Sequence, residues 1–336
     1  MSKYNYYKPV SIGTLKLPGN LFLAPVAGYS NAPFRSICAK MGADFAYTEL
    51  VSSEALVRAS GKTHELLRKG HNEKKYAIQL FGGNPENMAQ AAKMVSETYC
   101  CDCIDINAGC PMPKITGSCG GSFLMKEVPR LYAVVAAVVR ATEPFGIPVS
   151  VKIRSGWDDQ NRNWRECAVA CVDAGAKAIT LHPRTRAQRY SGKADWMLIG
   201  ELVARFRSQV SVFGSGDLFT PEDAADMLEQ TACDAVMFAR GAMGNPFIFQ
   251  QTKDLLLTGS YQKEIPLQTR LQAAFDELSE TAEAIGEKIA CLQMRKKFSS
   301  ATKGMKHGGA VREQLVRCST LAEYQAVLQD YLPKQE

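Results

Sequence analysis

The sequence has no long hydrophobic run and no apolar leader. Its longest apolar stretch, Leu131–Val139, is far shorter than the ~18 residues that a membrane-spanning helix requires. The segment Met1–Pro9 contains tyrosine and lysine but no apolar core, so we expect no signal peptide. The 11 cysteines lie mostly within apolar segments and are typical of reduced core thiols. These features predict a cytoplasmic protein with no membrane partner.

Two local patterns are also missing. The turn after the first expected strand, Pro25–Gly28, lacks the G-x-G-x-x-G pattern of a dinucleotide-binding open sheet. Cys100 and Cys103 have the spacing of one zinc-ligand pair, but no second pair or histidine stands at zinc spacing. We therefore expect no metal site, and we expect these cysteines to belong to the core.

Strand-like runs alternate with helical patterns along most of the chain. The expected strands are Leu21–Ala24, Phe45–Thr48, Tyr76–Phe81, Cys103–Asn107, Pro148–Ile153, Ala178–His182, Val210–Gly214 and Ala235–Ala239. The expected helices are Ala32–Lys40, a stretch past Ser53, Asn84–Thr98, Pro129–Thr142, Trp164–Ala174, helices starting at Asp195 and Thr220, and Phe247–Leu257. Eight strand–helix units over roughly 240 residues predict an α/β fold, a TIM (β/α)8 barrel. A doubly wound open sheet is the alternative, but it needs fewer strands and the missing glycine turn.

The alternation of expected strands and helices ends near Tyr261–Pro266. Beyond this segment only helical patterns follow, over Leu267–Ala290, Cys291–Lys303 and Leu321–Tyr331. We therefore expect a barrel domain over residues 1–260 and a small α-helical bundle over residues 261–336.

The charge of the chain is concentrated in that tail. Between Lys288 and Arg317 there are eight basic residues against the single acid Glu313, while the rest of the chain is nearly neutral. The basic residues are Lys288, Arg295, Lys296, Lys297, Lys303, Lys306, Arg312 and Arg317. The segment is either a docking surface for a polyanion or a solvated helix face, and charge alone leaves both open.

Polar residues stand where the expected strands end. Gln79, Asn107, Lys152, His182, Asp217 and Arg240 each end or follow an apolar run. The active face of a TIM barrel lies at the carboxyl ends of its strands. A lysine such as Lys152 that points into a barrel mouth is costly unless an anionic group meets it.

Two glycine loops follow the last two strands. Gly214–Asp217 and Ala239–Gly244 occupy the positions that form the phosphate site in many TIM barrels. Free backbone N–H groups together with Arg240 would hold a phosphate there. With Gln79 and Lys152, this site would suit FMN; ordinary turns are the alternative.

Cys110 stands in an unusual stretch, Asp105–Lys114, where a strand ends at Gly109 and prolines follow the cysteine. The residue could be a core thiol, a metal ligand or a catalytic group. An unperturbed thiol, with a pKa of ~8.5, is mostly protonated at neutral pH and can donate a proton. A nucleophilic role would need a base partner, and His182 is the only histidine placed at a strand end.

Several segments together resemble the tRNA-dihydrouridine synthases of the bacterial, DusB-like type. They are Leu23–Gly28, Gln79–Gly82, Asp105–Pro111, Gly121–Ser122, Val151–Trp157, Leu181–Arg186, Ser215–Asp217 and Arg240–Pro246. The resemblance implies an FMN-bearing barrel, a helical domain that binds tRNA, and NADPH as reductant. We also expect a monomer.

The resemblance also implies roles for individual residues. FMN would be held by Pro25, Val26, Ala27, Gln79, Lys152, His182, Ser215, Gly216, Asp217, Ala239 and Arg240. The target uracil would meet Asn107, Lys114, His182 and Arg184. A uridine of the tRNA would be flipped into the barrel and receive a hydride at C6 from FMN N5. Cys110 would give a proton to C5, and Lys114 or His182 would stabilise charge on the uracil carbonyls.

Two other functions stay open on the sequence alone. An FMN-dependent oxidoreductase of a free pyrimidine, such as a dihydroorotate dehydrogenase, would share the barrel but would not need a basic helical tail. A non-catalytic RNA-binding protein would not need Cys110, Lys152 and His182 together.

Overall fold

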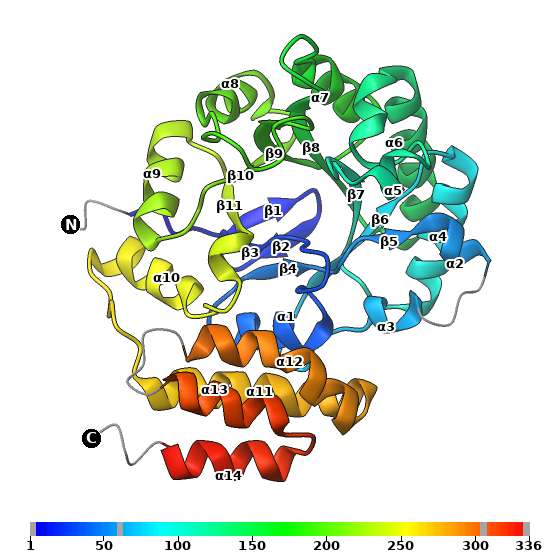
Figure 1. The fold of residues 1–336 in the computed structure, drawn as a ribbon. Helices are drawn as coiled ribbons and strands as arrows, with labels where there is room; N and C mark the ends of the chain where they lie inside the picture. The colour runs from blue at the N-terminus through cyan, green and yellow to red at the C-terminus, as the bar shows by residue number, and fades with distance from the viewer. Residues whose placement is uncertain (1–4, 59–62, 303–307, 332–336) are drawn as a thin grey trace.

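A closed barrel of parallel strands forms the body of the protein (Figure 1). The structure, a computed structural model, describes residues 5–58, 63–302 and 308–331. The barrel strands are β3 (Leu21–Leu23), β4 (Phe45–Tyr47), β6 (Tyr76–Phe81), β7 (Cys103–Ala108), β8 (Val149–Gly156), β9 (Ala178–Thr185), β10 (Ser211–Ser215) and β11 (Ala235–Phe238). Each pairs in parallel with its neighbour, and the pairings β11–β3 and β4–β6 close the ring. The short β5 (Val51–Ser52) extends the sheet beside β6. The predicted TIM barrel is confirmed.

Helices surround the barrel, as the alternating pattern predicted. They are α1 (Ala32–Lys40), α2 (Ser53–Val57), α3 (Thr63–Leu67), α4 (Pro85–Thr98), α6 (Val128–Thr142), α7 (Trp164–Asp173), α8 (Met197–Phe206), α9 (Pro221–Thr231) and α10 (Ile248–Thr258). The cap expected at Asn84 is present, because its side chain accepts a hydrogen bond from Asn87 N at 2.9 Å. The cap at Thr220 is a full capping box with Asp223. No helix among the described residues is both long and apolar enough to span a membrane.

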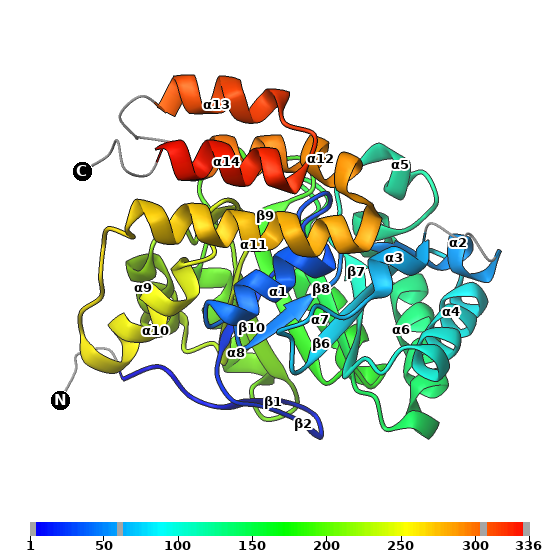
Figure 2. The same ribbon diagram turned by 90° about the horizontal axis from the view of Figure 1, so that it is seen from below.

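An antiparallel hairpin that the sequence did not reveal closes the amino-terminal end of the barrel (Figure 2). It consists of β1 (Val10–Ile12) and β2 (Leu15–Leu17), joined by a turn in which Gly13 has a φ of +57°. Its apolar side chains pack in one cluster with barrel residues such as Phe22 and Phe213. β1 and β2 each hold one polar residue, Ser11 or Lys16, between two apolar ones, whereas the equally short β3 and β4 are uninterrupted apolar runs, which explains why the hairpin was not predicted.

Two strands and one helix differ from their predicted bounds in ways that affect the mouth of the barrel. β8 and β9 each continue three residues beyond the prediction, and Arg154 pairs with His182 in the extension. The extension places Arg154 and Arg184 on strand ends rather than in loops. The helix expected to start at Asp195 begins instead at Met197.

The described residues of the tail form four helices with a hydrophobic core of their own. They are α11 (Leu267–Ile285), α12 (Glu287–Ala301), α13 (Gly308–Arg317) and α14 (Leu321–Tyr331). The prediction of one helix through Ala290 is wrong, because Gly286, with a φ of +87°, separates α11 from α12. α13 was not predicted. Lys303, Lys306 and His307 lie outside the described residues. The division of the chain at residue 260 stays a prediction.

The helical tail lies against α1 on one side of the barrel (Figure 1). Ser36 of α1 donates a hydrogen bond to Glu280 at 2.9 Å, and Lys40 forms an ion pair with Asp276 at 2.7 Å. These polar contacts surround a small apolar cluster that includes Ile37. Figure 2 shows α12 reaching over the end of the barrel opposite the hairpin, where the strands point.

Candidate active site

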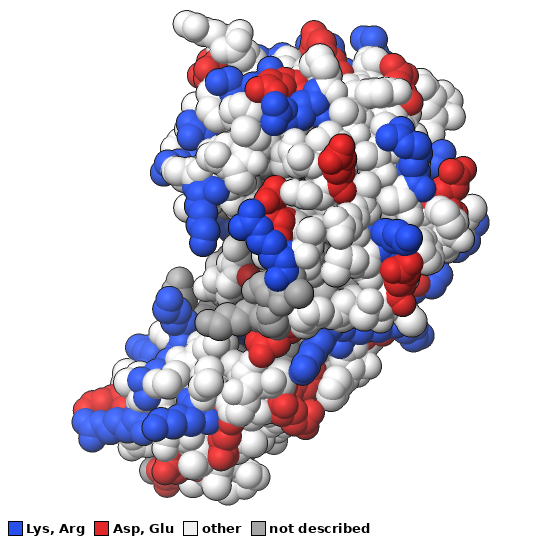
Figure 3. Space-filling view, turned by 90° about the vertical axis from the view of Figure 1, so that its right-hand side faces the viewer, with Lys and Arg blue, Asp and Glu red and all other residues white. Residues whose placement is uncertain are grey.

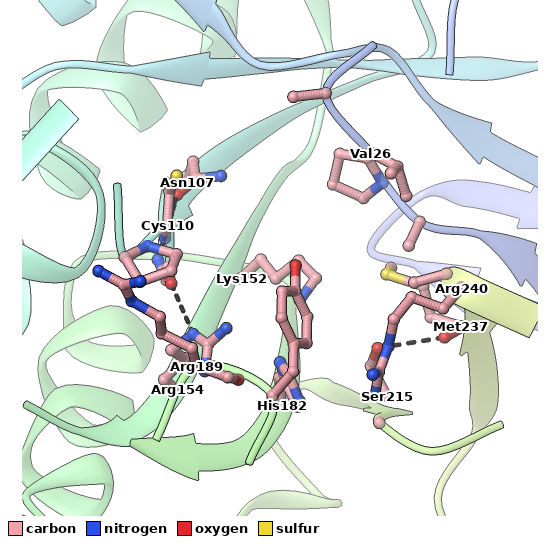
Figure 4. Close-up of a pocket in the computed structure, with 18 of the residues that line it drawn as sticks. Val26, Asn107, Cys110, Lys152, Arg154, His182, Arg189, Ser215, Met237 and Arg240 are labelled. Atoms are coloured by element: carbon pink, nitrogen blue, oxygen red, sulfur yellow. Dashed lines mark hydrogen bonds between the residues drawn. The ribbon is translucent and has the colours of Figure 1, made fainter. Parts of the chain in front are cut away.

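A cavity of about 630 Å³ opens at the carboxyl ends of the barrel strands. Figure 4 shows side chains from several strand ends converging on it. Most of the residues predicted from the sequence line this cavity: Pro25, Val26, Ala27, Asn107, Cys110, Lys152, His182, Ser215, Gly216, Asp217, Ala239 and Arg240. Segments that are distant in the sequence therefore meet at one site, as the barrel topology predicted.

Three predicted residues lie outside the lining. Gln79 is fully buried beneath the cavity. Arg184 is 1% exposed and reaches the site through Asp217, to which its Nη2 donates at 2.6 Å, and through His182, whose Nε2 lies 3.4 Å from its Nη1. Lys114 is exposed on the short helix α5 (Pro113–Thr116) and does not line the cavity. A role of Lys114 at the substrate stays a prediction.

A chain of polar side chains lies directly below the Cys110 loop. Gln79 Nε2 donates to Asp105 Oδ2 at 2.6 Å, and Asn107 Nδ2 donates to Gln79 Oε1 at 2.8 Å. Asn107 Oδ1 in turn accepts from the backbone N–H groups of Gly109 at 3.2 Å and Cys110 at 2.9 Å. Burial raises the pKa of Asp105 to about 7, although hydrogen bonds from Ser150 and Gln79 oppose the increase.

Cys110 is held on a loop that is fixed from both sides. Ser122 Oγ donates to the carbonyl of Cys110 at 2.9 Å, and Arg154 Nε donates to the carbonyl of Gly109 at 2.8 Å. Burial raises the pKa of the Cys110 thiol, while the Met112 backbone N–H and the charges of Arg154 and Lys152 oppose that increase. The thiol is therefore protonated at neutral pH, and it faces the cavity as a potential acid.

The amine of Lys152 faces the cavity without a protein acceptor. Among the described residues it has no hydrogen bond or ion pair, although Lys152 is only partly exposed. Burial and the neighbouring Arg154 lower the pKa of Lys152 to about 8, and Asp105 opposes this decrease. A partly desolvated amine with no partner favours a ligand that supplies an acceptor atom or a negative charge.

His182 is a neutral imidazole at the wall of the cavity. Burial lowers its pKa well below the usual value, and four surrounding cations, those of Lys152, Arg154, Arg184 and Arg240, lower it further. The ring can therefore donate or accept a hydrogen bond at neutral pH but does not add to the positive charge of the site.

The loops after β10 and β11 form a cradle with cationic groups around it. Gly216 has a φ of +119°, and a Cβ atom there would lie 2.9 Å from His182 Cδ2, so no side chain fits. Asp217, which also has a positive φ, accepts hydrogen bonds from both Arg184 and Arg240. The Arg240 guanidinium lies 4.6 Å from the ring centroid of Tyr190. A ligand can approach the backbone closely at Gly216, and the Arg240 guanidinium lies beside it. This arrangement fits an anionic group such as a phosphate.

Several lining residues were not predicted: Arg154, Arg189, Tyr190, Phe219 and Met237. One of them could have been found, because Arg154 lies two positions after Lys152 and strand residues two apart share a face. Arg189, Tyr190 and Phe219 belong to loops, where no periodic pattern indicates which side chains turn toward a site. Met237 lies within the short apolar strand β11 and could not be distinguished from core.

The sequence profile of one family, dihydrouridine synthase (Dus), matches residues 22–336. A "Probable tRNA-dihydrouridine synthase" of Treponema pallidum is 52% identical over 337 residues, covering 99% of each chain. The "tRNA-dihydrouridine synthase B" of Pseudomonas aeruginosa is 36% identical over 290 residues, covering 85% of each chain.

Solved structures of more distant proteins share the fold. A histamine dehydrogenase from Rhizobium sp. 4-9 superposes with a TM-score of 0.57 at 13% identity, over 82% of this chain and 51% of the other. A DHODH from Eimeria tenella, solved in complex with ferulenol, superposes with a TM-score of 0.54 at 16% identity, over 78% of this chain and 88% of the other. At these identities the likeness concerns the fold alone.

Proposed function

Because the chain belongs to the dihydrouridine synthase family, we propose that it is a tRNA-dihydrouridine synthase, which reduces the C5–C6 double bond of uridines in tRNA. The observation that carries the proposal is the position of Cys110. This protonated thiol lines a cationic cavity together with the unpartnered amine of Lys152. A proton donor next to a site for an anionic ligand is the arrangement that such a reduction requires.

The cavity residues fit FMN as the cofactor. Gly216 leaves room for a close approach to the backbone, and Arg240 provides a cation at the phosphate end. Lys152 would donate to an acceptor on the ring system, because its amine has no partner among the described residues. Pro25, Val26 and Ala27 after β3 would form an apolar wall. When bound, the flavin supplies the hydride that reduces uracil C6.

The residues of the chain supply the remaining chemistry. Cys110 donates its proton to C5 of the uracil and is reprotonated from solvent, so that one hydride and one proton complete the reduction. His182, as a neutral imidazole, holds a hydrogen bond to a carbonyl oxygen or a ring N–H without adding charge. Asn107 fixes the loop of Cys110 through its Oδ1.

The RNA would reach this cavity along α12. A groove of about 580 Å³ lies between the barrel loops near Gly28 and Glu49 and the helices α11 and α12. Ile289 and Leu292 of α12 line it and are about half exposed, at 52% and 50%. Figure 3 shows basic residues along the edge of the helical part that projects beside the hollow between the two parts of the molecule. Such a surface suits a phosphate backbone with apolar contacts to bases.

We further propose NADPH as the reductant and a monomer acting in the cytoplasm. The reductant is tested by comparing how fast NADPH and NADH bleach the bound flavin. The oligomeric state is tested by light scattering of the purified protein.

The decisive experiment measures dihydrouridine by mass spectrometry. The purified protein is incubated with NADPH and unmodified tRNA, and in parallel with free uracil and with orotate. We expect dihydrouridine in the tRNA and no turnover of the free pyrimidines. Turnover of orotate or uracil with none of tRNA would identify a free-pyrimidine oxidoreductase instead. Binding of tRNA with no reduction of any substrate and no bound flavin would identify a non-catalytic RNA-binding protein.

A further inference from the structure

Asp105 lies below the active site and touches none of the cavity. Its side chain is completely buried, and so is that of Gln79, with which it is paired in register across β7 and β6. Ser150 of β8 donates to the second carboxylate oxygen, so both oxygens of Asp105 have partners. The reduction proposed above uses Cys110, Lys152 and His182 but assigns no task to this buried carboxyl group.

The hydrogen bonds from Asp105 to Cys110 form a chain with one direction. Above its pKa of about 7 Asp105 is ionised and can only accept, so Gln79 must turn its NH2 group toward Asp105 and its carbonyl oxygen toward Asn107. Asn107 must then donate to Gln79, which directs its own oxygen toward the backbone N–H groups of Gly109 and Cys110. The ionised carboxylate permits each amide only this orientation, whereas protonation of Asp105 at lower pH would release it.

Burial makes this direction matter. Asp105 and Gln79 are not exposed at all, so water cannot replace a partner that either of them loses, and Asn107, which lines the cavity, is only 7% exposed. If the residue at position 105 could also donate a hydrogen bond, the side-chain amide of Gln79 could rotate to the reversed orientation. The side-chain amide of Asn107 could then rotate in the same way. The N–H groups of the Cys110 loop would then face an NH2 group instead of an oxygen.

We propose that Asp105 is a positioning residue, which acts through Gln79 and Asn107 to fix the loop that carries Cys110. The inference rests on the proposed function only for its effect on catalysis. The effect on the Cys110 loop can be measured without any turnover.

The first test is alkylation of individual cysteines, followed by peptide mass spectrometry. Asp105→Asn keeps the size of the side chain but permits the reversed orientation. We expect Cys110 to be alkylated about five-fold faster, the change that corresponds to one lost hydrogen bond of ordinary strength. Cys100, which is exposed, and Cys119 serve as internal references and should react at unchanged rates. Asp102→Asn, at the opposite end of β7, is the matched control and should leave Cys110 unchanged.

Two further variants separate the chain of hydrogen bonds from a simple effect of charge. Asn107→Ala breaks the chain next to Cys110 without changing any charge, and it should speed alkylation as Asp105→Asn does. Combining the two should add nothing, because both remove the same restraint. Additive effects would overturn the proposal.

A swap of the amide and the carboxylate provides a rescue. In the double variant Asp105→Asn with Gln79→Glu, the amide now at position 105 would donate to the carboxylate now at position 79. That carboxylate would also accept from Asn107, so the original direction returns. Near wild-type alkylation of Cys110 is expected, and rates as high as in the single variant would contradict the proposal.

Two controls protect the interpretation of these rates. Asp105 faces Tyr47, Cys103 and Lys152, so all rates are compared over a range of pH. Thermal unfolding identifies a variant that fails to fold, in which case Asn107→Ala and the swap decide the question.

The kinetic test depends on the proposed function. If the wild-type protein reduces tRNA, Asp105→Asn should lower kcat and leave the KM for tRNA unchanged, since the residue does not touch RNA. If the wild-type protein reduces no tRNA, the proposed function fails, whereas the alkylation results still decide the role of Asp105.

Discussion

The amine of Lys297 on α12 forms an ion pair with the carboxylate of Glu277 on α11, and both side chains are nearly buried, at 13% and 7% exposure. The same amine lies 4.8 Å from the ring centroid of Phe34 in the barrel helix α1. Lys297 belongs to the basic segment Lys288–Arg317, which the sequence left open as either a docking surface for a polyanion or a solvated helix face. Its charge is used inside the protein, where it joins α11, α12 and the barrel.

Removing the lysine of this pair should destabilise the protein. Lys297→Met leaves Glu277 buried without a counter-charge, and the loss of one partner of a buried pair costs about 3 kcal/mol. Burial already raises the pKa of Glu277, against the opposing effect of Lys297. Denaturant unfolding should show this loss, while Lys296→Met, at an exposed position, should change stability by less than about 0.5 kcal/mol. Equal effects of the two variants would contradict the assignment.

The neighbouring Lys296 should contribute to tRNA binding rather than to folding stability. Lys296 is exposed beside the groove under α12, so Lys296→Glu should weaken tRNA binding with little effect on folding. If Lys296 neutralises one phosphate, its loss should reduce the slope of log affinity against log salt by about one. Filter binding at several salt concentrations measures the slope. Lys177→Glu, exposed just before β9 at the amino-terminal end of the barrel, should bind tRNA like the wild type.

Replacement of Cys110 should separate the two halves of the reaction. Cys110→Ala removes the proton donor, and loss of a positioned acid typically lowers a rate by about 10²- to 10⁴-fold. Bleaching of the flavin by NADPH should be unaffected, because that step needs no proton for uracil C5. Stopped-flow absorbance follows the first half-reaction, and mass spectrometry of tRNA follows the second. Cys100→Ala is the control, and normal dihydrouridine formation by Cys110→Ala would refute the assignment.

Lys152 should destabilise the flavin-free form of the protein near neutral pH. Its pKa is about 8 in the folded protein against a usual 10.5, so below pH 8 folding must bury a charged amine. The penalty therefore exists below pH 8 and disappears as the pH rises toward 10.5. Lys152→Met should stabilise the flavin-free protein at pH 7 by about 2 kcal/mol, less than the full shift implies because solvent enters the cavity.

The measurement for Lys152 is thermal unfolding between pH 7 and pH 10.5. The gain from Lys152→Met should shrink across this range, and FMN should bind the variant more weakly. Lys193→Met, at an exposed loop position, is the control and should show neither effect. A gain that does not depend on pH would mean that packing, rather than the buried charge, is responsible.

The barrel could be predicted because its signals are local. Each of its eight strands is a short apolar run closed by a turn, and cap residues such as Asn84 and Thr220 mark helix starts within a few positions. The hairpin β1–β2 was missed because a polar residue interrupts each of its short strands, unlike the continuous apolar runs of β3 and β4. The break at Gly286 was missed because a single glycine within a helical pattern does not by itself end a helix.

Only those site residues that lie near the carboxyl ends of strands could be predicted from the sequence. Asn107, Lys152 and His182 end or follow apolar runs in the sequence, and parallel strands bring such positions to one edge of the barrel. Lys114 was placed at the substrate by resemblance, yet it points to solvent on α5, because the direction of a side chain on a four-residue helix depends on contacts distant in sequence. For the same reason, the burial of Lys297 could not be inferred from a run of basic residues.

The hairpin at the amino-terminal end has a consequence for the order of events in turnover. Val10, Ile12, Leu15 and Leu17 fill that end of the barrel with packed side chains. Molecules therefore reach the cavity past the loops at the other end. A dinucleotide reductant and an RNA would both approach through the opening that the described residues leave at that end, so they would use it in turn. If the oxidised dinucleotide leaves before the RNA binds, the two substrates bind different forms of the enzyme, and double-reciprocal initial-rate plots at several fixed concentrations of either one should give parallel lines.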